Sequence, residues 1–167
     1  MKRILLLTMV FFSIFSYAQF PEGFEGATFP PAGWVVEDNG IGTAQSWGIT
    51  TATGFGWVHQ GARSAMVNRD NGATSTGLAQ DWLITPQVTV PANGQIRFYA
   101  RSGSNGEQGS IYKVLMSTTT QNRAAFTTTL ATYTELDIEN LPFEQMVILL
   151  NAYAGQNVYF AFVMEVN

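Results

Sequence analysis

The chain alternates between short apolar segments and short runs of turn residues. From residue 19 onward, segments rich in Val, Ile, Thr and aromatic residues are separated by clusters of Gly, Pro, Asn and Ser at fairly even intervals. This spacing is typical of an all-β sandwich or barrel. The predicted strands are 34–37, 46–50, 64–68, 82–90 with a break at Pro86, 95–101, 111–117, 128–133, 145–149 and 158–166.

The last predicted strand is apolar on both of its faces. Successive side chains of a strand point to opposite faces, so one face carries Val158, Phe160, Phe162, Met164 and Val166, and the other carries Tyr159, Ala161, Val163 and Glu165. Such a strand needs a neighbour on each side, so we predict that it is central. Helical periodicity is not sustained over a dozen residues, and only single turns are expected, at 121–126 and 150–153.

The first residues have the pattern of a secretion signal. Lys2 and Arg3 precede an almost unbroken apolar run over 4–15, and Ala18 ends a small-residue cleavage site. The run is shorter than the roughly 20 residues that span a bilayer, and no later segment is longer. We therefore expect residues 1–18 to be a signal peptide, 19–167 to be one domain, and no membrane insertion.

Charge and cysteine content exclude several functions. Removing Lys2 and Arg3 lowers the basic count from 8 to 6 against 12 acids, so the net charge moves from −4 to −6. An acidic chain without a cationic stripe is a poor partner for nucleic acid. The chain has no cysteine, which excludes a thiol nucleophile, a thiolate metal site and a lipid anchor on cysteine. We expect a secreted or cell-surface protein.

Eight short motifs occur in an order that resembles a known family. They are FEG at 24–26, FPPAGW at 29–34, EDNG at 37–40, SW at 46–47, SAM at 64–66, DWLITP at 81–86, RFYAR at 97–101 and NAYAGQNVY at 151–159. Together they span nearly the whole mature chain and resemble the cleaved-adhesin family. That family is also described as choice-of-anchor J, and includes the haemagglutinin-adhesin modules of gingipains from Bacteroidetes.

The resemblance implies a fold, a cofactor and a role. The implied fold is a jelly-roll β-sandwich similar to galactose-binding-like and MAM domains. The implied cofactor is calcium near the early loops, and the implied role is adhesion or binding of carbohydrate or protein. The family closes with a further strand that carries paired acids, so we expect the chain to be C-terminally incomplete and to be followed by further domains of a longer parent protein.

Three residues fall where the family has its early acidic loops. Calcium takes six to eight oxygen ligands from carboxylates and carbonyls, and Glu25, Asp38 and Asn39 are our candidate ligands. The alternative is an ordinary Asp-Asn-Gly turn, because Asp and Asn favour turns for backbone reasons alone. We interpret Asp70 as part of a second such turn, and Asp81 as either a ligand or a cap of its strand.

Aromatic residues in a glycine-rich loop suggest a ligand surface. Phe55, Trp57 and His59 lie in this loop, and with Tyr99 they offer flat surfaces to sugar rings or apolar side chains. Loops at the ends of a sandwich are common binding positions. The alternative is that these rings cover an edge of the core, as we expect of Trp34, Trp47 and Trp82.

Catalytic motifs are missing from the sequence. His59 is the single histidine, and no Gly-x-Ser-x-Gly, His-Glu-x-x-His or phosphate-loop motif accompanies it. We therefore predict no enzyme but a calcium-stabilised adhesion module whose partner is an extracellular glycan or protein. One alternative is the non-catalytic accessory domain of a larger secreted hydrolase, either a peptidase or a glycosidase. Another is a structural spacer without a ligand.

Overall fold

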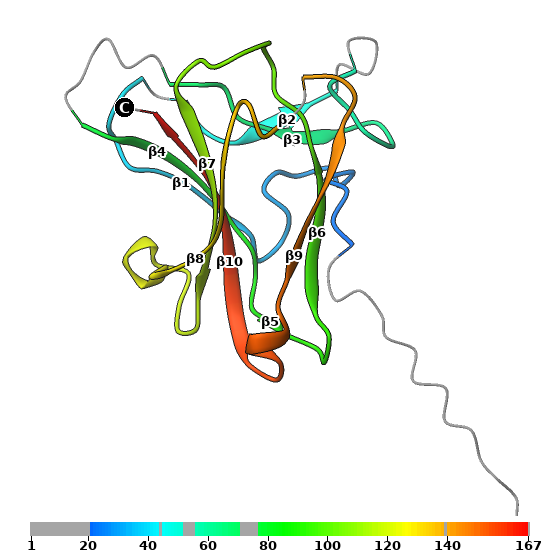
Figure 1. Cartoon of the computed structure of the whole chain (residues 1–167), viewed down its shortest axis with the longest axis vertical. Helices are drawn as coiled ribbons and strands as arrows, with labels where there is room; N and C mark the ends of the chain where they lie inside the picture. The colour runs from blue at the N-terminus through cyan, green and yellow to red at the C-terminus, as the bar shows by residue number, and fades with distance from the viewer. Residues whose placement is uncertain (1–20, 44, 52–55, 71–76, 139, 167) are drawn as a thin grey trace, which may run out of the picture.

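A two-layered β-sandwich forms the body of the molecule (Figure 1). The computed structural model describes residues 21–43, 45–51, 56–70, 77–138 and 140–166. The larger sheet has the strand order β1 (Val35–Asp38), β4 (Ala79–Ile84), β10 (Asn157–Val166), β7 (Ser110–Ser117) and β8 (Thr128–Thr134), and β5 (Val88–Thr89) pairs with one end of β10. The second layer consists of β6 (Gln95–Ala100) and β9 (Glu144–Leu149), and β2 (Gly48–Thr50) and β3 (Ser64–Met66) form a hairpin at one end. All pairings are antiparallel, which confirms the all-β prediction.

The strand β10 occupies the centre of the large sheet, as predicted. Its residue Ala161 lies opposite Ile84 of β4 on one side and Leu115 of β7 on the other. Backbone groups along most of its length are therefore paired in both directions. This pairing lets an almost wholly apolar strand be buried without unpaired amides.

Each face of β10 contributes to a separate core. The face between the two layers packs Val158 and Phe160 against residues of the large sheet, β9 and the loops beside β5, and Phe98 of β6 meets Phe162 at a ring-centroid distance of 5.2 Å. The members of this first cluster are Val88, Val90, Val114, Met116, Ile148, Leu150, Val158 and Phe160.

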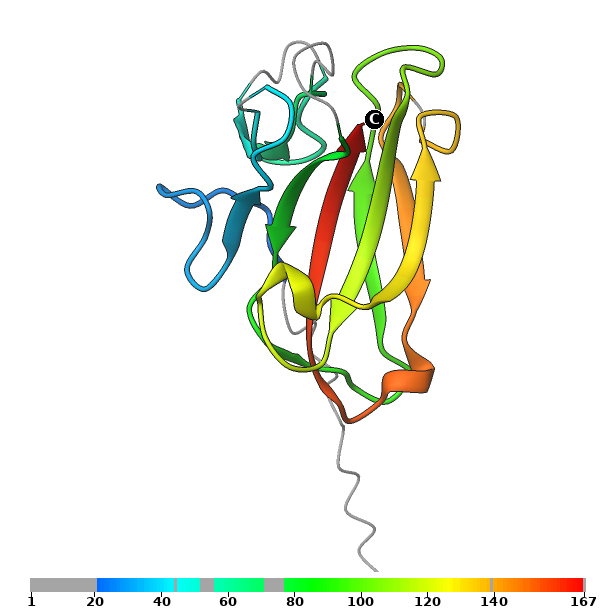
Figure 2. The ribbon, with the colours of Figure 1, turned by 90° about the vertical axis from the view of Figure 1, so that its left-hand side faces the viewer.

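The outer face of the large sheet carries the second core. Ala161 and Val163 of β10 pack there with Trp82, Ile84, Leu115 and Phe126. Phe126 follows the short 3-10 turn η3 (Arg123–Ala125), which lies over this face in Figure 2. At the end of the same face Glu165 is 4% exposed, and it is paired with Lys113 at 2.6 Å and Gln80 at 2.8 Å.

The differences from the predicted strands have local causes. The predicted strand 82–90 is divided into β4 and β5 at Pro86, as expected of a residue without an N–H group. Of the three tryptophans expected inside, Trp82 is 5% exposed, whereas Trp34 and Trp47 are half-buried. The indole N–H of Trp47 donates to the carbonyl of Asp81, which holds the ring at the end of the sandwich.

Helical structure is limited to single turns in the described residues. The two expected turns are present as η3 and as η4 (Asn151–Tyr153). No helix in this part of the chain is long and apolar enough to cross a membrane.

Removing the ring of Phe160 tests the first core. Phe160 is 6% exposed, so Phe160→Ala leaves a cavity, and we expect it to lower the free energy of unfolding by about 3–5 kcal/mol in urea denaturation. Leu136 is 73% exposed, and Leu136→Ala, the control, should change stability by less than about 0.5 kcal/mol. Equal effects of the two variants would contradict the assignment of the core.

Candidate functional site

Three segments far apart in the sequence bring aromatic rings together at the end of β6. The ring of His59 stacks on Tyr99 with centroids 3.8 Å apart and an interplanar angle of 14°. Phe143, just before β9, meets His59 edge-on at 5.4 Å. The side chain of Gln145 donates a hydrogen bond of 2.8 Å to the hydroxyl of Tyr99. The loop at 56–60 is thereby attached to both strands of the small sheet.

Trp57 is held in place beside these rings. The guanidinium carbon of Arg101 lies 4.4 Å from the centroid of the Trp57 ring, and Arg101 also donates to the carbonyl of Gly56 at 2.7 Å. Gly103 lies so close to the indole that a Cβ there would be 3.3 Å from its Cη2 atom. Trp57 is half-buried, so its main effect in this arrangement is to fix the loop that carries His59.

The accessible part of the cluster is formed by His59 and Tyr99. Both side chains are exposed, Tyr99 by 46%. Ser104, Asn105, Glu135 and Asn140 line a hollow of about 180 Å³ in the loops at the same end of the sandwich. Flat rings together with amide and hydroxyl groups can stack on a ligand and donate hydrogen bonds to it. The structure thus brings together three of the four predicted ligand-binding residues, while Phe55 lies outside the described residues.

The candidate calcium ligands have hydrogen-bonding roles in separate places. The carboxylate of Glu25 accepts hydrogen bonds from the backbone N–H groups of Ala62 at 3.1 Å and Arg63 at 3.2 Å. Asp38 accepts one from the N–H of Gly40 at 2.6 Å. These contacts order a loop and a turn, and calcium binding at these residues stays a prediction.

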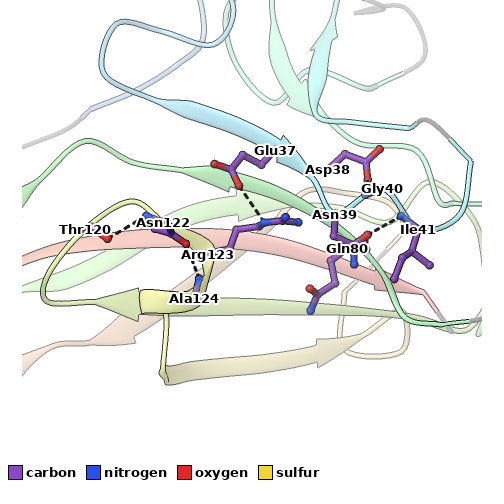
Figure 3. Close-up of polar contacts among 10 residues, drawn as sticks. All are labelled: Glu37, Asp38, Asn39, Gly40, Ile41, Gln80, Thr120, Asn122, Arg123 and Ala124. Carbon is purple, nitrogen blue, oxygen red and sulfur yellow. Dashed lines mark hydrogen bonds and ion pairs between the residues drawn. The ribbon is translucent and has the colours of Figure 1, made fainter.

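Asn39 connects its turn to the start of β4. Its side-chain oxygen accepts hydrogen bonds from the N–H groups of Ile41 and Gln80, both at 3.1 Å, and its amide donates to the carbonyl of Leu78 at 2.8 Å. Figure 3 shows the contact with Ile41 at the end of β1, close to the ion pair of Glu37 with Arg123 at 3.0 Å. The oxygen of Asn39 is therefore already used by two donors.

Two other carboxylates are buried near Asp38. Asp70 and Asp81 are each 1% exposed, and Asp70 Oδ2 and Asp81 Oδ1 have no hydrogen-bond partner among the described residues. Asp81 lies directly opposite Asp38 in the pairing of β1 with β4. Burial, and then the charges of Asp70 and Asp38, raise the pKa of Asp81 to about 7. The charges of Asp70 and Asp38 thus both act on Asp81 at this end of the sheet.

The backbone of Gly42 lies very close to the carboxylate of Asp70. Gly42 has φ +92°, and a Cβ at this position would lie 2.8 Å from Cγ of Asp70. The hydroxyl of Thr43 donates to Asp70 Oδ1. No group of three or more His, Asp or Glu side chains in the described ranges is close enough to hold a metal by itself. A cation here would need backbone carbonyls or water as additional ligands.

The sequence predicted a turn at Asp70 and either a ligand or a strand cap at Asp81, and it did not predict that both carboxylates are buried. Alternation along 81–84 places Asp81 on the same face as Leu83, and its partner Met164 belongs to the face of β10 that points between the layers. An acid at an inward position of a strand is uncommon, because Asp is almost never fully buried unless it is paired. For Asp70 the sequence carried no such signal, because it lies in a loop.

Comparison with known proteins agrees with this fold. The family model of the Cleaved Adhesin Domain matches residues 18–162. Hemagglutinin A of Porphyromonas gingivalis is 31% identical over 167 residues, and that of strain W83 is 30% identical over 161. Both matches cover 84% of this chain, which spans only 6% and 7% of the length of those relatives.

Solved structures share the fold at low sequence identity. The K1 and K2 cleaved adhesin domains of Lys-gingipain match with TM-scores of 0.58 and 0.60, each at 21% identity. These matches cover 86% and 88% of this chain and 91% and 94% of those domains. TmCBM61, solved in complex with beta-1,4-galactotriose, matches with a TM-score of 0.54 at 17% identity, over 86% of this chain and 83% of that one. The jelly-roll sandwich is thus confirmed, and the chain belongs to the cleaved adhesin domain family.

Proposed function

We propose that this domain is a non-catalytic adhesion module that binds carbohydrate through the exposed rings of His59 and Tyr99. The observation that carries the proposal is the stacking of these two rings, which come from segments forty residues apart, at an exposed end of the sandwich. Adhesion is supported by the similarity to Hemagglutinin A, and carbohydrate as ligand by the fold shared with a galactotriose-binding module.

Binding would combine stacking with a few hydrogen bonds. Aromatic faces pack against the C–H groups of a sugar ring, while the Tyr99 hydroxyl and the Gln145 amide orient its hydroxyls. Trp57 and Arg101 would act by holding the loop in place before the ligand arrives, which reduces the entropy cost of binding. No bond is made or broken in this role. His59 contacts two aromatic rings, and these neither orient it as a base nor supply a nucleophile.

We further propose that calcium stabilises the domain at Asp70 and Asp81, with Asp38 nearby. Two buried carboxylate oxygens without partners fit a hard cation, because they are the ligands that calcium prefers. The proposal retains Asp38 from the predicted set because it lies opposite Asp81. It omits Glu25, both of whose carboxylate oxygens accept backbone hydrogen bonds, and Asn39, whose one side-chain oxygen accepts two. When bound, the ion would neutralise the acids and fasten the segment after β3 to the large sheet.

Export completes the proposed role. The predicted signal peptide, with cleavage near Ala18, lies outside the described residues, and N-terminal sequencing of secreted protein would test it. A module that acts outside the cell would find glycans there, and extracellular proteins are the alternative ligands that a screen should include.

Removing the exposed rings should weaken glycan binding. On a glycan array, we expect Tyr99→Ala and His59→Ala each to lower the apparent affinity about fivefold or more, because each removes stacking worth about 1 kcal/mol. Gln95→Ala is the matched control, since Gln95 is exposed at the other end of β6 on the same face as Tyr99. Binding of the wild type to matrix proteins but to no glycan would refute carbohydrate as the ligand.

Calcium should raise the melting temperature of the wild type. At about 100-fold excess over its dissociation constant, a ligand of the native state adds about 2.7 kcal/mol, or roughly 5 °C or more for a chain of this size. Asp70→Asn and Asp81→Asn should reduce this response. Asp137→Asn, in an exposed turn at the end of β8, should retain it. An unchanged melting temperature of the wild type with calcium would exclude the site.

Without metal, stability should fall as the pH rises from about 4 to about 7. The pKa of Asp81 is raised from 3.8 to about 7 in the folded state, so its stabilising contribution is complete below pH 4 and is lost as the pH passes 7. Urea denaturation in metal-free buffer should show this loss for the wild type and a smaller one for Asp81→Asn. Hydrogen bonds from Thr134 lower the pKa of Asp137, so Asp137→Asn should keep the wild-type slope. If the Asp81→Asn variant lost as much stability with rising pH as the wild type, the assignment of this pH dependence to Asp81 would be wrong.

A further inference from the structure

Exposed large hydrophobic side chains gather on the small sheet and the loop that enters it. Five of the seven such residues in the described part of the chain are Tyr99 on β6, Val147 and Leu149 on β9, and Leu136 and Leu141 between β8 and β9. Val147 is 45% exposed and Leu149 is 68% exposed. Exposed apolar side chains on neighbouring strands are a feature of interaction sites.

One edge of β9 is without a strand partner within the described ranges. β9 pairs with β6 over six residues without irregularity, whereas the pairing of β7 with β8 has a register shift between Val114 and Leu115. In Figure 2, β9 lies on the same side of the molecule as β8, opposite β1. An edge strand presents a row of N–H and C=O groups, and these pair readily with another extended chain.

β9 carries few of the features that normally protect an edge. Edges are blocked by charged side chains, especially Lys, by Pro or by bulges, and β9 has only Glu144, at its first residue. The two edge strands of the large sheet are more polar than β9. β8 exposes Thr129 and Thr132, and β1 ends in Glu37 and Asp38. Of these three strands, β9 is the one that exposes large hydrophobic side chains at its edge.

We propose that β9 pairs antiparallel with β9 of a second copy of this chain. Directly opposed residues of antiparallel strands share a face, so a two-fold axis at Val147 places Val147 against itself. The same register places Gln145 opposite Leu149 and Met146 opposite Ile148. The exposed Val147 and Leu149 are then covered on the outer face, and Met146 and Ile148 extend the core on the inner face. The two small sheets become one sheet of four strands.

This register contains no contact between like charges. The only charged residue of β9 is Glu144, which would lie opposite Leu150 of the second copy. Arg97 lies opposite Val147 within one copy, so the two Arg97 residues are three strand spacings apart, about 14 Å, beyond the screening length of about 10 Å at 0.1 M salt. Since the strand is complementary to itself, a second copy is the occupant that this edge fits.

The expected dimer is reversible. The area buried when two six-residue strands pair is small compared with the roughly 1,200–2,000 Å² buried in stable interfaces. Association should therefore depend on concentration in the purified chain. Salt should favour it, because the net charge of −4 makes two copies repel each other.

Cross-linking through a single thiol tests the register. The chain has no cysteine, so Val147→Cys introduces one thiol, and a short thiol-specific cross-linker should join two copies in proportion to their association. Thr132→Cys places a matched exposed thiol on β8 and should give little dimer. Equal cross-linking of the two variants would overturn the proposal, because it would show collision instead of pairing through β9.

Sedimentation equilibrium gives an independent test. The wild type should change from monomer to dimer as its concentration rises, and Val147→Lys should lower the association constant at least tenfold. If circular dichroism shows that Val147→Lys does not fold, Leu149→Lys is the second variant to measure. A wild type that stays monomeric at all concentrations would overturn the proposal, even if its β9 edge bound an unrelated extended peptide. Dimerisation that both lysine variants retain would also overturn it.

Discussion

Burial of β10 on both faces, with pairing along both edges, is the constraint on which the rest of this structure depends. The strand pairs with β4 on one side and with β7 on the other. Its two faces supply Phe160 to the core between the layers and Val163 to the core on the outside. An apolar strand can be buried in this way only when its backbone groups are paired on both edges, so β4 and β7 are required by β10 itself.

Two regions at the same end of the sandwich use this rigid body differently. At one corner of the large sheet, β1 and β4 bring Asp38 and Asp81 into register, and the loop after β3 adds Asp70. Burial of the Asp81 carboxyl, together with the charges of Asp70 and Asp38, makes its charged form costly and raises its pKa. The carbonyl of Asp81 also accepts a hydrogen bond from the indole of Trp47, which attaches the segment before β2 to the sheet.

The small sheet carries the surfaces suited to contact with other molecules. Its strand β6 positions Tyr99, which His59 and Phe143 join from loops. Its strand β9 exposes Val147 and Leu149 beside an edge that has no strand partner among the described residues. A ligand site and a self-pairing edge on one sheet would let two copies present two ligand sites together. Such bivalency strengthens weak binding without any new contact, which suits an adhesion module.

The sequence by itself determined the strands, the central place of β10, the break at Pro86 and the family, because alternation, turn residues and motif order are local properties of the chain. It also selected three residues that the fold brings together, Trp57, His59 and Tyr99. Only the tertiary structure decided that Trp57 is held by Arg101 while His59 and Tyr99 are exposed. It also decided that one carboxylate oxygen of Asp70 and one of Asp81 are buried with no hydrogen-bond partner among the described residues. The physical reason is that burial and charge proximity depend on contacts between segments distant in sequence. No local pattern encodes such contacts.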